Sequence, residues 1–229
     1  MKYNPFVDLL NIMYPNLCVV CGETLMKGEQ HLCLSCLYNT PKTNYHLEQN
    51  NPAEKRFWGK VPIFRGTSFF FFQKGSPFQK MLHNLKYKGD KDLGTVLGKY
   101  AGTDLLTSSD FSSIDTAIPV PLHPKKYQKR GYNQSEWIGK GLSETMGKPQ
   151  DTKNLIRVKE NVSQTKKSVY ERYENTEGIF QLKDETVFEG QHVLLVDDVL
   201  TTGSTLEACA QTLLKTKDIR ISFFTLAMA

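Results

Sequence analysis

The sequence has no long hydrophobic run. No stretch of its 229 residues approaches the roughly 18 apolar residues that a membrane-spanning helix needs, so we expect no transmembrane segment. The segment from Met1 to Asp8 contains an early acidic residue and no apolar core, which is unlike a secretory signal peptide. A cytoplasmic protein is therefore the expectation.

Two common catalytic patterns are also missing. Residues 94–100 are superficially similar to a P-loop, but the segment is one residue short and no Ser or Thr follows Lys99. The same residues lie in a helical pattern, so we do not interpret them as a phosphate-binding loop. No Ser-His-Asp triad is recognisable either, so any activity has to rest on other groups.

Cysteine is scarce, and four of the five cysteines lie near the N-terminus. They form two CxxC motifs separated by eleven residues, a spacing that can enclose one tetrahedral Zn²⁺ ion. The alternatives are disulfides, which a cytoplasm disfavours, and a redox centre, whose CxxC motif normally occurs singly. His31 is near enough in sequence to substitute as a ligand, although we expect it to lie outside the ligand set. The predicted zinc ligands are Cys18, Cys21, Cys33 and Cys36.

Positive charge is concentrated in one part of the chain. The formal net charge is +5, and residues 125–172 hold 12 Lys and Arg against 5 Asp and Glu. Such a concentration favours an anionic ligand, although a solvated basic surface has the same pattern. The candidate contacts to pyrophosphate, another anion or DNA are Leu122, His123, Lys125, Lys126, Arg130, Lys166 and Lys167.

One stretch, Val193 to Thr205, combines three features of a ligand site. It opens with four apolar residues, which are typical of a strand buried on both faces of a parallel sheet. Two carboxylates follow, Asp197 and Asp198, whose oxygens suit sugar hydroxyls or Mg²⁺. A hydroxyl-rich loop then leads into a helical pattern, and the amides at a helix N-terminus favour phosphate. A buried strand with a polar turn and an ordinary helix cap is the alternative. The predicted phosphate ligands are Thr201, Thr202, Gly203, Ser204 and Thr205.

The remaining apolar patterns predict an α/β fold with a parallel sheet and right-handed crossovers. We expect residues 1–60 to form an N-terminal helix and a zinc lobe with a linker, and residues 61–229 to form the sheet domain. The long polar segment 159–177 is predicted to be a lid over the ligand. The run Phe69–Phe72 favours core packing over a base-stacking platform. Strands are expected at 64–72, 114–120, 155–158, 193–196 and 219–228, and helices at 5–14, 78–87, 93–106 and 133–146.

Several short motifs occur together in one order along the chain. They are the paired CxxC motifs, Leu85-Lys86-Tyr87-Lys88-Gly89, Pro119-Val120-Pro121-Leu122-His123, Arg130-Gly131-Tyr132-Asn133-Gln134, Gln164-Thr165, Glu171-Arg172-x-x-Asn175 and Val196-Asp197-Asp198-Val199-x-Thr201-Thr202-Gly203. In this set the chain resembles the ComF family of competence proteins, and Val196 to Thr205 resembles the phosphoribosyl-pyrophosphate (PRPP) signature of type I phosphoribosyltransferases.

The resemblance implies a type I phosphoribosyltransferase-like domain with a small Cys₄ zinc lobe. It also implies that Asp197 and Asp198 hold the ribose hydroxyls of PRPP, that the following loop holds the 5′-phosphate, and that Mg²⁺ accompanies the ligand. For the family it implies a role in natural transformation, where incoming single-stranded DNA is handled with a partner helicase. Three functions remain open: a phosphoribosyltransferase of unknown acceptor, a non-catalytic module that binds nucleic acid or a partner, and a site for a regulatory nucleotide or PRPP.

Overall fold

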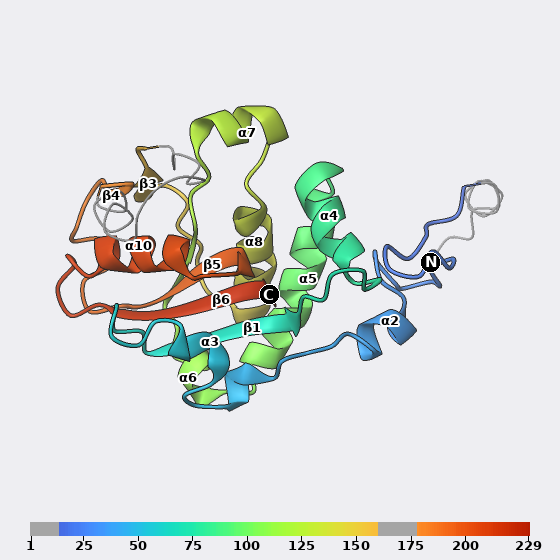
Figure 1. The fold of residues 1–229 in the computed structure, drawn as a ribbon, viewed down its shortest axis with the longest axis horizontal. Helices are drawn as coiled ribbons and strands as arrows, with labels where there is room; N and C mark the ends of the chain where they lie inside the picture. Colours follow the sequence, from blue (N-terminus) through green and yellow to red (C-terminus); the bar gives the residue numbers. More distant parts are fainter. Residues whose placement is uncertain (1–13, 160–177) are drawn as a thin grey trace.

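The computed structural model describes residues 14–159 and 178–229. Its centre is a parallel sheet with the strand order β1-β6-β5-β2 (Figure 1). This sheet confirms the predicted α/β fold class. The strands are β1 (Arg65–Phe71), β2 (Thr116–Pro119), β5 (His192–Leu200) and β6 (Arg220–Met228). The helices are α2 (Leu34–Tyr38), the 3₁₀ helix η1 (Tyr45–Leu47), α3 (Pro52–Lys55), α4 (Gln79–Tyr87), α5 (Lys91–Leu105), α6 (Ser109–Ser112), α7 (Pro124–Arg130), α8 (Gln134–Met146) and α10 (Ser204–Leu213).

Strand β5 is buried on both faces, as its unbroken apolar run predicts. Leu194 and Val196 belong to the core on the side of α4, α5 and α8, whereas Val193 and Leu195 belong to the core on the side of α10. All four side chains are fully buried. Because successive strand residues point to opposite faces, one short sequence builds both halves of the core.

Helices α5 and α8 pack closely through glycines. A Cβ atom on Gly98 would lie 2.2 Å from the carbonyl oxygen of Ile138, and one on Gly141 would lie 2.1 Å from that of Thr95. The glycines of segment 94–100 therefore let two helix backbones approach each other. This finding agrees with the rejection of a P-loop, because the segment lies inside α5.

Two segments differ from the sequence-based expectation. The strand predicted at 155–158 is present as β3 (Leu155–Arg157), but it pairs antiparallel with β4 (Phe180–Leu182) in a separate two-stranded sheet. The basic residues after Pro124, expected only as candidate contacts to an anion or DNA, form helix α7, which begins with the proline that favours a first turn. The predicted N-terminal helix over 5–14 lies almost wholly outside the described residues, as does nearly all of the lid at 159–177.

The segment 41–60, predicted as a linker, packs against the sheet. Phe57 is buried and its ring contacts that of Phe223 on β6, with centroids 4.8 Å apart. The domain boundary at residue 60 stays a prediction, but the polar segment before it belongs to the core of the sheet domain.

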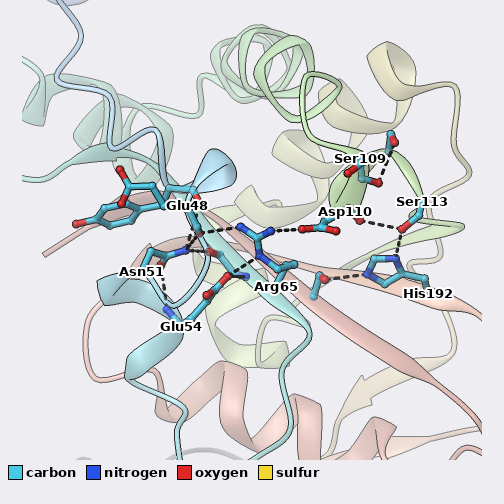
Figure 2. A network of polar contacts seen from close by, with 12 residues as sticks. Glu48, Asn51, Glu54, Arg65, Ser109, Asp110, Ser113 and His192 are labelled. Carbon is cyan, nitrogen blue, oxygen red and sulfur yellow. Dashed lines mark hydrogen bonds and ion pairs between the residues drawn. The ribbon is translucent and has the colours of Figure 1, made fainter.

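A buried polar network holds this segment at the amino-terminal edge of the sheet (Figure 2). The Arg65 guanidinium donates to Glu54 Oε1 at 2.9 Å, to Asp110 and to the Glu48 carbonyl at 2.7 Å. Beside it, the His192 ring contacts hydroxyls of Ser113 and Ser222. These groups lie at the starts of β1 and β5, opposite the edge where ligands bind in such sheets, so we assign them to stability.

Candidate phosphoribosyl and metal sites

The two predicted acidic residues lie near the carboxyl end of β5. Strand β2 pairs with β5 only as far as Pro119 opposite Val196, whereas β6 continues beside β5 to Leu200. Asp197 and Asp198 therefore come directly after the point at which β2 leaves the sheet. This is the position where open α/β sheets bind ligands.

Two neighbouring groups donate hydrogen bonds to the Asp197 carboxylate. Its Oδ1 accepts hydrogen bonds from the Ser135 hydroxyl at 3.1 Å and from the Asp198 amide at 2.9 Å. Burial raises the pKa of the Asp197 carboxyl to about 7, and the negative charge of Asp198 contributes to the same shift. A cationic or hydroxyl-bearing ligand would relieve this unfavourable placement of two adjacent acids.

Asp198 makes an ion pair with a residue distant in sequence. Its Oδ2 lies 3.1 Å from Nζ of Lys86, on helix α4. Both side chains are partly buried, so dissolved salt screens their attraction less than it screens a surface salt bridge. Helix α4 thus places a cation over the acidic pair.

The predicted phosphate loop leads directly into helix α10. Its N-cap is Gly203, which has a φ of 82° and no side chain with which to cap the helix. The first-turn amides and the residues Thr201, Ser204 and Thr205 therefore surround a small hollow that suits an anion. A Cβ atom on Gly203 would lie 2.9 Å from the Phe57 ring, so the loop also requires glycine for space.

The predicted pyrophosphate loop starts beside the acidic pair. The Val120 amide donates to the Val196 carbonyl at 2.8 Å, and Asn133 Nδ2 donates to the Val120 carbonyl at 3.0 Å. Leu122 and His123 follow in the loop and are partly buried. Of the basic candidates, Lys125 and Lys126 are exposed on α7, Arg130 is partly exposed at its end, and Lys166 and Lys167 lie outside the described residues.

The four predicted metal ligands form a cluster. The sulfur atoms of Cys18, Cys21, Cys33 and Cys36 all lie within 4.8 Å of one another. The distance between the Cys21 and Cys33 sulfurs is 3.7 Å, close to the ~3.8 Å edge of a tetrahedron with ~2.3 Å zinc–sulfur bonds. His31 instead lies 3.3 Å from Asp90, the N-cap of α5, and is not part of this cluster. The cluster can bind a metal ion.

Backbone amides favour the thiolate form of Cys18. Burial alone would raise the pKa of Cys18, but hydrogen bonds from the amides of Cys21, Cys33 and Val20 outweigh burial and lower it to about 6. Thiolates are the form that binds metal, so Cys18 is ready to bind near neutral pH. The pKa values of Cys21 and Cys36 are raised instead, so these two thiols would release their protons as the metal binds. The fifth cysteine, Cys209, is fully buried on α10.

Comparison with known proteins agrees with this geometry. Residues 128–228 match the model of the phosphoribosyl transferase domain. The DNA utilization protein YhgH of Shigella flexneri is 27% identical over 216 residues, which cover 88% of this chain and 92% of that protein. Competence protein ComFC of Bacillus subtilis is 27% identical over 220 residues, which cover 91% of this chain and 82% of that protein. The chain is a homologue of the ComF competence proteins. A solved hypoxanthine phosphoribosyltransferase from Staphylococcus aureus also aligns, with 16% identity, a TM-score of 0.39 and coverage of 68% of this chain and 73% of that one.

The residues that match the phosphoribosyl transferase domain model include β5, its loop and α10, but neither the cysteine cluster nor α4. Sequence reasoning missed the roles of Lys86, Ser135 and Phe57. Lys86 was part of a recognised motif without a role, and nothing in the sequence around Ser135 or Phe57 indicates which side chain each contacts. Their contacts with Asp198, Asp197 and the loop at Gly203 depend on the tertiary fold.

Proposed function

We propose that the chain binds PRPP together with Mg²⁺ at the carboxyl end of β5, and that it acts in natural transformation. The observation that carries the proposal is the continuity of β5, its loop and α10. One stretch places an acidic pair a short loop before a helix whose N-cap, Gly203, has no side chain to cap it. This order matches a ribose 5-phosphate group, with its hydroxyls at the acids and its phosphate at the helix.

Each part of PRPP has a matching group. The 5′-phosphate would lie on the Thr201–Thr205 loop, and the ribose hydroxyls on Asp197 and Asp198. The pyrophosphate would lie against the Pro121–His123 loop. Mg²⁺ would supply further positive charge to the leaving pyrophosphate. Asp197 and Asp198 would hold the ribose and orient its C1 atom. The ammonium group of Lys86, which contacts Asp198, could form an ion pair with an oxygen of the bound ligand instead.

If the bound PRPP reacts, the acceptor attacks C1 and the bond from C1 to the pyrophosphate oxygen breaks, leaving its electron pair on pyrophosphate. Positioning and charge stabilisation are sufficient for such a step, since no covalent intermediate with the protein is involved. The four clustered cysteines would bind Zn²⁺ as a structural ion, in keeping with an all-sulfur tetrahedral site.

Calorimetric titration of PRPP with Mg²⁺ into the metal-loaded protein tests the site. We expect saturable binding that Asp198→Asn weakens at least tenfold, because the variant removes a charge that holds the ribose. Asp92→Asn is the matched control, since Asp92 is an exposed carboxylate at the first turn of α5. Absence of binding to the folded wild type would contradict the proposal.

A second candidate function, binding of single-stranded DNA in the cytoplasm alongside a helicase, is favoured by helix α7. Residues 124–129 are all exposed, and they include three lysines and Tyr127. For a single strand, each phosphate contact contributes about 0.7 to the slope of log affinity against log salt. The double variant Lys126→Ala and Lys129→Ala should therefore lower this slope by about 1.4, whereas Lys215→Ala with Lys217→Ala should not. An unchanged slope would exclude α7 from the contact.

A further inference from the structure

A groove of about 250 Å³ lies at the amino-terminal edge of the sheet. Two aromatic residues that line it, Trp58 and Phe64, are 59% and 43% exposed. Val61, Pro62 and Ile63 contribute the aliphatic part of its wall. Exposed aromatic side chains beside an apolar groove are typical of a surface that binds a partner.

Phe64 fixes the place of the groove in the fold. It directly precedes β1, and its ring packs edge-on against that of His192, the first residue of β5, with centroids 5.3 Å apart. Glu54, which also lines the groove, belongs to the buried network in Figure 2, where its carboxylate is paired with Arg65. The two exposed rings therefore lie at the starts of the strands, whereas the proposed phosphoribosyl site lies at their carboxyl ends.

The core of the domain supports the wall of the groove. Phe57, which also lines it, is buried, and its ring lies 4.8 Å from that of Phe223 on β6. The amides of Lys60 and Val61 donate to the Phe57 carbonyl at 3.0 and 3.3 Å, which forms the turn that carries Trp58. Because these contacts order the turn in the free protein, a partner that binds here loses little free energy to the ordering of a loop.

A cation accompanies each of the two exposed rings. The ammonium group of Lys55 lies 5.7 Å from the centroid of the Trp58 ring, and the guanidinium of Arg220 lies 4.8 Å from that of Phe64. Both cationic residues are exposed. The rim of the groove, formed by these four residues, therefore combines apolar surface with positive charge.

This arrangement favours an acidic peptide over a stacked nucleic acid. Because a cation of the protein already covers one face of each ring, the rings are less available to bases, which need an open aromatic face. The cations themselves stay accessible to carboxylates, and the groove volume suits one large apolar side chain. The phenylalanine run adds little to this surface, since Phe69 and Phe70 are buried in the core, as predicted.

We propose that the groove binds an acidic segment of a partner protein. One large apolar side chain of that segment enters the groove, and flanking Asp or Glu residues pair with Lys55 and Arg220. Trp58 is the anchor of the interface, because its exposed ring loses the most apolar surface to a partner. The proposal does not depend on the phosphoribosyl site.

Selection of random peptides displayed on phage against the metal-loaded full chain tests the groove. We expect the enriched peptides to carry net negative charge and one Leu, Phe or Trp. A synthetic consensus peptide, followed by fluorescence polarisation, should bind Trp58→Ala at least tenfold and Lys55→Glu at least threefold more weakly than the wild type. Both residues are exposed, so the substitutions leave the core intact, and unchanged urea unfolding reports this.

Tyr38→Ala and Lys215→Glu are the matched controls, because both residues are exposed and neither lines the groove. Both variants should bind the peptide as the wild type does. Enriched peptides without an acidic bias, or none that depends on Trp58, would overturn the proposal. Binding of oligothymidylate that Trp58→Ala abolishes would assign the groove to nucleic acid, and a dimer that this variant dissociates would assign it to a second copy of the chain. Either result would overturn the proposal too.

Discussion

At the scale of single residues, Asp197 links ligand binding to protonation. Its pKa is raised to about 7 in the free protein by burial and then by Asp198, so near neutral pH this carboxyl is only partly ionised. A sugar hydroxyl or Mg²⁺ prefers the ionised form. We expect PRPP binding with Mg²⁺ to release a fraction of a proton between about pH 6 and 7.

Calorimetry in buffers of different ionisation enthalpy measures this release. The apparent binding enthalpy should vary with buffer for the wild type at pH 6.5, after correction for the ligand's own titration. In Asp197→Asn the protein's share of that dependence should vanish. A buffer dependence that is equal in the two proteins would show that Asp197 does not titrate on binding.

Substitution of Gly203 tests whether the phosphate loop needs a residue without a side chain, both for space and for its backbone conformation. Gly203→Ala places a methyl group against the Phe57 ring at a φ of 82°, so the loop or the ring has to move. We expect a loss of stability of roughly 1–3 kcal/mol and a fall in PRPP affinity of tenfold or more. Urea unfolding and calorimetry measure the two effects.

Gly190→Ala is the matched control for this substitution. Gly190 has a φ of 67° but no atom within 4 Å of the added Cβ, so it carries the backbone strain without the collision. It should cost about 1 kcal/mol and leave ligand affinity unchanged. Similar losses of affinity in the two variants would mean that the loop at Gly203 does not touch the ligand.

At the scale of elements, helix α4 connects the cysteine cluster to the acidic pair. Lys80 Nζ donates to the Val20 carbonyl at 2.9 Å, beside Cys18 and Cys21, and Lys86 at the other end contacts Asp198. Cys18, Val20 and Leu32 also share one hydrophobic cluster with Met81 and Leu82 of α4. The cysteine segment therefore supports the helix that supports the site.

Removal of the metal should loosen this helix. After chelation, we expect the amides of residues 79–87 to exchange hydrogen at least tenfold faster and PRPP affinity to fall, whereas the amides of α10 keep their protection. Exchange measured by mass spectrometry reports both helices in one experiment. Lys80→Met should weaken the link while all four cysteines still hold the metal, giving a smaller effect in the same direction. Unchanged exchange in α4 after chelation would contradict the coupling.

The elements also show which features a sequence can reveal. Strand β5 and α10 were predicted because both carry a local pattern: an unbroken apolar run and a 3.6-residue period. The cysteine cluster was predicted from spacing alone, and the structure brings its four sulfurs together. The antiparallel pairing of β3 with β4 could not be predicted, because each strand is three residues long and carries no register signal. Nor could the Lys86–Asp198 pair, which joins residues more than a hundred positions apart.

At the scale of the whole molecule, two titrating groups on β5, His192 and Asp197, have opposite effects on how stability depends on pH. Burial, followed by the charge of Arg220, lowers the pKa of His192 to about 4, from an ordinary 6.5. The unfolded chain therefore binds more protons at this group, and stability falls as pH drops from 6.5 towards 4. The raised pKa of Asp197 acts in the other sense: the folded chain binds more protons, and stability falls as pH rises from 3.8 to 7.

Between about pH 4 and 6.5 these two slopes should largely cancel, each being at most ~1.4 kcal/mol per pH unit. Asp197→Asn leaves the histidine effect alone, so its stability relative to wild type should increase steadily with pH across this window. His192→Gln, which can keep a hydrogen bond to Ser113 or Ser222, should show the reverse trend relative to wild type. The double variant should follow the wild-type profile again. Urea unfolding at half-unit pH steps measures all four proteins, and parallel curves for the wild type and both single variants would show that neither group titrates with folding.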